Sequence, residues 1–151
     1  MTARKQTAKY LIQLLMKEVY PSIQYHFLMM VWKGDFLLEE KKSGTEEVLS
    51  NLRTEFNSLY TYETKLVFPA VLKAFDENTT NQPSNISELI VLTQKKETRI
   101  KQLIEDLKES MVLQGEENAT VSQLIATFEE DFFPTKEDWN GMVSKEFSAQ
   151  I

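Results

Sequence analysis

Residues 52–71, LRTEFNSLYTYETKLVFPAV, carry the pattern that decides the fold. Apolar side chains recur here three or four residues apart, which is the spacing of one face of an α-helix. Glu63 falls on the same face and interrupts an otherwise apolar stripe with a carboxylate. The predicted core stripe of this helix is Leu52, Phe56, Leu59, Glu63, Leu66, Ala70 and Ala74.

The same helical spacing extends over most of the chain. Only four glycines and four prolines supply turn material, so a few long elements are expected rather than many short strands. Residues 78–84 contain no apolar side chain and are predicted to link two helices. Amphipathic helices with short connections bury their apolar stripes against one another, so the sequence predicts an all-α, antiparallel four-helix bundle.

The domain boundaries are predicted from the prolines and from the end of the apolar pattern. Proline cannot continue the interior of a helix, so Pro21 is expected to end a first short helix. This gives one domain over residues 1–151, with an additional N-terminal helix at 1–20, a bundle core at 21–135 and a C-terminal tail segment at 136–151.

Composition excludes several classes of function. The chain has one histidine, His26, and no cysteine, which excludes thiol catalysis, disulfides, cysteine-based metal sites and iron sites built from many histidines. A formal net charge of −6 argues against nucleic-acid binding. No export signal or bilayer-spanning apolar run is recognised, so we expect a cytoplasmic protein without a membrane segment.

Residues 52–71 resemble the second helix of hemerythrin-like (HHE cation-binding) domains, and are nearest in pattern to the di-iron iron–sulfur-cluster repair proteins. That helix reads His-x-x-x-Glu followed by an apolar-Phe-Pro ending, and the motif recurs on the fourth helix. Here residues 62–69, YETKLVFP, are echoed by residues 128–134, FEEDFFP. The resemblance implies a four-helix bundle with a metal site between the helices.

Carried onto this chain, the ligand pattern of the family is mostly absent. Counted back from Phe68-Pro69, the glutamate of the motif is retained as Glu63, whereas its histidine becomes Leu59. The corresponding positions of the fourth helix are Leu124 and Phe128, which cannot bind metal. The histidine of the first helix corresponds to His26, and Lys96 or Glu97 replaces the histidine of the third. Oxygen carriage of the hemerythrin type is therefore excluded.

The remaining polar residues on core stripes, His26, Glu63 and Lys96 or Glu97, allow two interpretations. They can form an internal hydrogen-bonded or ion-pair cluster. Alternatively, His26, Glu63 and Glu97 can form a vestigial or reduced metal site, because one histidine and two carboxylates are ligands that zinc or iron accepts.

Two functions follow from these interpretations. The favoured one is a non-enzymatic bundle without a cofactor that acts through a protein partner or self-association, or as a regulatory domain. Four aromatic residues lie outside the predicted core stripes: Trp32, Phe36, Trp139 and Phe147. They are expected either to form a contact surface or to cap the bundle. The alternative is a sensor that binds metal or a small ligand around His26 and Glu63.

Overall fold

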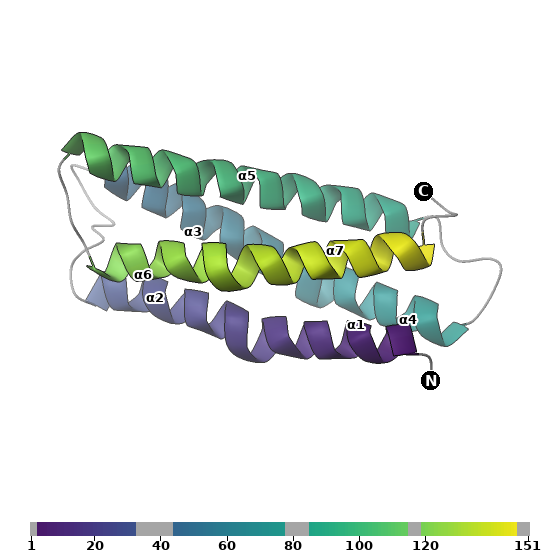
Figure 1. Ribbon diagram of the computed structural model, residues 1–151. Helices are drawn as coiled ribbons and strands as arrows, with labels where there is room; N and C mark the ends of the chain where they lie inside the picture. The colour runs from purple at the N-terminus through teal and green to yellow at the C-terminus, as the bar shows by residue number, and fades with distance from the viewer. Residues whose placement is uncertain (1–2, 33–43, 78–84, 115–118, 148–151) are drawn as a thin grey trace.

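The computed structural model describes residues 3–32, 44–77, 85–114 and 119–147, all of which are helical, and these residues contain no strand. The all-α prediction is therefore confirmed. Four long helical rods lie side by side in Figure 1. Their segments are α1 (Ala3–Leu14), η1 (Leu15–Val19) and α2 (Tyr20–Trp32); α3 (Gly44–Tyr62), η2 (Glu63–Val67) and α4 (Phe68–Glu77); α5 (Asn85–Gln114); and α6 (Ala119–Thr127), η3 (Phe128–Phe132) and α7 (Phe133–Phe147).

The rods alternate in direction along the chain, as the colour gradient of Figure 1 shows. The first rod packs against the last through α2 with α6 and α1 with α7, and the second packs against the third through α3 with α5. The side chains between the rods form one apolar core, in which most of the large residues are fully buried. Each rod contributes one apolar stripe of helical periodicity, and the four stripes together form this core.

Three of the rods contain a five-residue π-helical segment, and each segment begins six residues before a proline. Inside an α-helix a proline ring collides with the carbonyl group four residues earlier, and the residue lacks an N–H to donate. A π turn widens the helix, with backbone N–H groups bonding to carbonyls five residues back, as Tyr20 N–H does to Leu15 O. The three π turns therefore let the helices pass their prolines. The third rod, α5, has no proline and stays α-helical throughout.

The predicted break at Pro21 is wrong for this reason. η1 absorbs the proline, and the helix runs without interruption from Ala3 to Trp32. The additional N-terminal helix is thus the first half of the first bundle helix rather than a separate element. The predicted tail at 136–151 is likewise part of the fourth rod as far as Phe147, while residues 148–151 lie outside the described residues.

The π turn also shifts the core stripe of the second rod by one position. Leu66, predicted to be in the core, is 53% exposed, and Val67 is fully buried in its place. Val71 then occupies the core position that the sequence pattern assigned to Ala70, which is only partly buried. One extra residue in the turn rotates the residues that follow it relative to a regular α-helix, and residue periodicity alone does not reveal that rotation. Further along the rod, Ala74 is buried as predicted.

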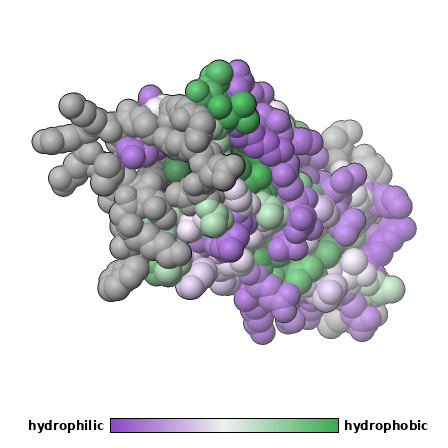
Figure 2. Space-filling view, turned by 60° about the vertical axis from the view of Figure 1, so that its left-hand side comes forward, coloured by the Kyte–Doolittle hydropathy of each residue, from purple (hydrophilic) through white to green (hydrophobic). Residues whose placement is uncertain are grey.

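The exposed large apolar side chains of the described residues include two adjacent pairs, Val91-Leu92 and Val112-Leu113, and in Figure 2 apolar side chains reach the surface in separate patches among hydrophilic ones. Trp139 and Phe147 are buried in the apolar core, so they do not form a contact surface. Phe36 and the side chain of Trp32 lie outside the described residues. Within the described part of the chain, no helix is long and apolar enough to cross a membrane.

Candidate functional site

Glu63 is completely buried at the first position of η2, where three rods meet. Its Oε1 accepts a hydrogen bond from the hydroxyl group of Tyr20, and its Oε2 accepts one from the ammonium group of Lys136. Tyr20 follows η1 directly and Lys136 lies in the first turn after η3. All three π turns therefore border this buried polar contact, and single π turns inside α-helices are often found at functional sites.

Lys136 forms the cationic half of this contact and its side chain is 1% exposed. An ion removed from water costs several kcal/mol unless it is paired. Besides Glu63, the ammonium group lies 5.9 Å from the ring centroid of Phe68 and 5.7 Å from that of Trp139. These rings present their negative faces to the cation and partly replace its hydration shell.

Glu97 on α5 is the second carboxylate beside Lys136, with its Oε2 4.0 Å from the ammonium nitrogen. Asn140 Nδ2 donates to both carboxylate oxygens of Glu97, at 3.1 and 3.3 Å. Burial raises the pKa of Glu97 to about 7; Lys136 and the hydrogen bond from Asn140 oppose this shift, and the charge of Glu63 adds to it. Tyr20, Glu63, Lys136, Glu97 and Asn140 are hereafter called the polar cluster.

The polar cluster holds two carboxylates and one ammonium group. It is electrically neutral when Glu97 is protonated and carries one net negative charge when Glu97 is ionised. The pKa of Tyr20 is raised well above its usual value by burial and by the neighbouring Glu63, so its phenol remains a hydrogen-bond donor and adds no charge. Ionisation of Glu97 therefore switches the cluster between neutral and anionic forms near neutral pH.

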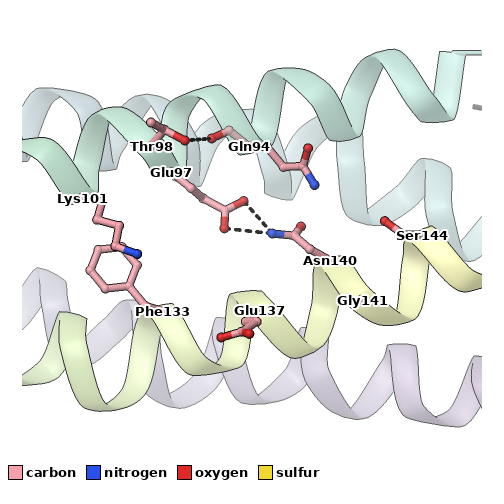
Figure 3. A pocket seen from close by; sticks show the side chains of 9 residues that line it. All are labelled: Gln94, Glu97, Thr98, Lys101, Phe133, Glu137, Asn140, Gly141 and Ser144. Atoms are coloured by element: carbon pink, nitrogen blue, oxygen red, sulfur yellow. Dashed lines mark hydrogen bonds between the residues drawn. The ribbon is translucent and has the colours of Figure 1, made fainter.

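A groove of about 560 Å³ between α5 and α7 reaches this cluster through Glu97 and Asn140 (Figure 3). Both side chains extend into the space between the two helices and meet there. We call this space the α5–α7 groove. Its lining residues are Gln94, Glu97, Thr98 and Lys101 from α5, and Phe133, Glu137, Asn140, Gly141 and Ser144 from α7.

Three buried polar atoms on these two helices have no hydrogen-bond partner among the described residues: Thr93 Oγ1, Trp139 Nε1 and Asn140 Oδ1. Thr93 precedes Glu97 by one helical turn, and Trp139 follows Lys136 by one turn. Buried polar groups without a partner cost about 1–3 kcal/mol each, so these three atoms lower the stability of the bundle around the polar cluster.

The structure brings together two of the three predicted metal ligands. Glu63 and Glu97 share Lys136, whereas His26 is half-buried on α2, and its ring packs edge-on against that of Tyr25 with centroids 6.0 Å apart. Burial lowers the pKa of His26. Among the described residues, no group of three or more His, Cys, Asp or Glu side chains is placed to hold a metal ion.

The third-helix alternative, Lys96, lies apart from the cluster. Its ammonium group donates to Ser58 Oγ at 2.8 Å and lies 5.8 Å from the ring centroid of Tyr62, between α3 and α5. Glu97, and not Lys96, is thus the α5 residue that faces Glu63. Glu63 and Glu97 thus take part in an internal ion-pair cluster, which is one of the two interpretations drawn from the sequence. The cation of this cluster is Lys136.

Apolar side chains fill the other positions that the family resemblance assigned to metal ligands. Leu59, Leu124 and Phe128 are all fully buried, and the ring of Phe128 packs edge-on against Phe56 with centroids 6.0 Å apart. These side chains can pack but cannot coordinate a metal, so the three positions contribute to the core.

Sequence reasoning missed Tyr20 and Lys136. The sequence does carry a signal for the π turns beside these residues, in the three aromatic-proline pairs at 20–21, 68–69 and 133–134, of which only the last two entered the predicted repeat. Each pair follows a π turn, so the repeat marks a shared backbone geometry. Comparison with known proteins identifies no matching family model, no similar curated protein and no similar solved structure.

Proposed function

We propose that this chain is a non-enzymatic bundle of hemerythrin-like architecture that needs no metal and acts as a binding or regulatory domain. One observation carries the proposal: the ammonium group of Lys136 lies between Glu63 and Glu97, the two carboxylates predicted as metal ligands. A protonated lysine supplies within the chain the positive charge that a metal would bring.

The donor set is a poor match for a di-iron or zinc centre. Protein metal sites of this kind usually have three or four protein ligands around one position, and among the described residues no such group of His, Cys, Asp or Glu comes together. Both oxygens of Glu63 already accept hydrogen bonds, and Asn140 binds both oxygens of Glu97. A metal ion would also have to displace the Lys136 ammonium group or repel it at close range. The residues therefore favour a structural ion pair over a reduced metal site around His26 and Glu63.

The proposed function includes a contact with a protein partner or with a second copy of the chain. Val112 and Leu113, near the C-terminal end of α5, are 81% and 79% exposed and are apolar side chains that such a contact would bury. Light scattering at increasing protein concentration would reveal self-association, and Leu113→Glu should weaken it.

Elemental analysis tests the absence of a metal requirement. The protein is produced in medium supplemented with iron and zinc and purified without a chelator. We expect no stoichiometric metal and the same midpoint of thermal unfolding with or without EDTA. Metal near one atom per chain that is lost in Glu63→Gln and kept in Glu109→Gln, an exposed glutamate on α5, would overturn the proposal.

A further inference from the structure

The α5–α7 groove is the place where the polar cluster meets the surface. Glu97 belongs to both, since it lines the groove and lies 4.0 Å from Lys136. Because Lys136 is shared with the buried Glu63, an ionised Glu97 has only part of one positive charge to balance it. A cation bound in the groove can supply the remaining positive charge.

The groove presents hydrogen-bond acceptors to an incoming group. Glu97 presents a carboxylate whose two oxygens accept from Asn140 Nδ2, and each oxygen keeps a further lone pair for another donor. Glu137 contributes a second carboxylate to the lining. A ligand that donates hydrogen bonds and carries positive charge fits these atoms, whereas an anion would meet two carboxylates.

The lysine that lines the groove does not supply the missing charge. The side chain of Lys101 extends alongside the ring of Phe133, with its ammonium group 5.9 Å from the ring centroid (Figure 3). The neighbouring charges that shift the pKa of Glu97 are those of Lys136 and Glu63. Phe133 at the same time gives the groove an apolar wall.

We propose that the α5–α7 groove binds a small organic cation, a protonated primary amine with an apolar body, whose ammonium group donates to the carboxylate of Glu97. The apolar body extends from Glu97 over Gly141, while the ring of Phe133 lies beside Lys101 at the other end of the groove (Figure 3). The site rests on the proposed function, since it names the ligand class of a metal-independent binding domain. Its volume of about 560 Å³ suits a small molecule, because such sites measure roughly 300–1,000 Å³.

Gly141 makes the proposed site testable without altering a charge. A Cβ atom added at this position meets nothing within 4 Å, so a larger side chain enters open space instead of the core. Gly141 borders the α5–α7 groove and a second groove between α1 and α7, so Gly141→Leu should narrow the α5–α7 groove while the fold remains intact. Gly141→Ala is the matched control, because it adds one methyl group and leaves most of the groove free.

The test is a titration with phenethylammonium chloride at pH 7.5, followed by amide chemical shifts and by calorimetry. We expect saturable binding with shifts confined to residues 94–101 and 133–144. The neutral analogue 2-phenylethanol should bind at least about tenfold more weakly, because a charge-assisted hydrogen bond contributes about 1.5–3 kcal/mol. Glu97→Gln should reduce binding by a similar factor, and Glu109→Gln should leave it unchanged.

Each result of the titration either supports or overturns the proposed site. Equal binding of the amine and the alcohol, no binding of the amine, or unchanged binding in both Glu97→Gln and Gly141→Leu would overturn the proposed site. If Glu97→Gln does not fold, loss of binding in Gly141→Leu with retention in Gly141→Ala supports it. Elemental analysis is independent of this titration. The proposed amine site can therefore be wrong while the proposed metal-independent function is right, and the proposed function can be wrong while the amine site is right.

Discussion

Lys136 Nζ donates a hydrogen bond to Glu63 Oε2 in the interior of the bundle, and this contact ties α7 to η2. Both side chains are excluded from solvent, at 1% and 0% exposure. A buried pair of this kind is weak evidence for stability by itself, but losing one partner leaves an ion without compensation. The pair thus fixes which residues face one another where three rods meet.

Tyr20→Phe should destabilise the protein by about 1–3 kcal/mol, because it leaves one oxygen of a buried carboxylate without its donor. The ring contacts of Tyr20 with Phe56 and Tyr60 would remain, so the loss reports the hydroxyl group alone. Urea unfolding monitored by circular dichroism measures the change. Tyr25→Phe on the same rod, where the side chain is 57% exposed, is the control and should stay within about 0.5 kcal/mol of wild type. Equal effects of both substitutions would refute the role of the hydroxyl group.

Glu97 should make the protein less stable as the pH rises from about 4.5 to about 7. Burial raises its pKa from 4.5 to about 7 in the folded chain. Between these values the folded state binds the proton more tightly than the unfolded state does, so the free energy of unfolding falls with increasing pH. The full effect of this one group is up to about 3 kcal/mol.

Other carboxylates titrate in the same range, so the contribution of Glu97 is obtained by difference. Urea unfolding at several pH values is compared for wild type, Glu97→Gln and Glu109→Gln. We expect the difference between wild type and Glu97→Gln to change over this pH range and then level off above about pH 8. A pH-independent difference would show that Glu97 has an ordinary pKa.

Pro69→Ala should change the free energy of unfolding by less than about 1 kcal/mol, although proline costs about 3 kcal/mol in an ordinary helix interior. The π turn at η2 has already removed the collision with the preceding turn, and the N–H of Phe68 is satisfied by Glu63 O. Thermal unfolding provides the measurement. A gain of about 3 kcal/mol would mean that the proline is strained and that the π turn does not relieve it.

The fold was predictable from sequence because helical periodicity records which side chains are buried. Leu52, Phe56 and Leu59 of the predicted stripe on α3 are in the core as predicted. The four rods follow from such stripes without knowledge of any contact between them.

The candidate site was only partly predictable, because the π turns decide it. Glu63 and Glu97 could be selected as polar residues on apolar stripes. Lys136 could not, since a lysine is normally exposed and the register after η3 depends on a backbone widening that periodicity does not encode. The proline rule that predicted a break at Pro21 failed for the same reason.

The free-energy coupling between Lys136 and Glu63 tests the central claim most directly. Lys136→Met, Glu63→Gln and the double variant are compared by urea unfolding, with Lys145→Met, an exposed lysine on α7, as the control. Lys136→Met should cost about 3–5 kcal/mol because it strands a buried carboxylate. The double variant should recover most of that loss, which gives a coupling of roughly 2–3 kcal/mol. Additive effects of the two substitutions, or a Lys136→Met variant as stable as Lys145→Met, would contradict the claim that this lysine is the internal counter-ion of the bundle.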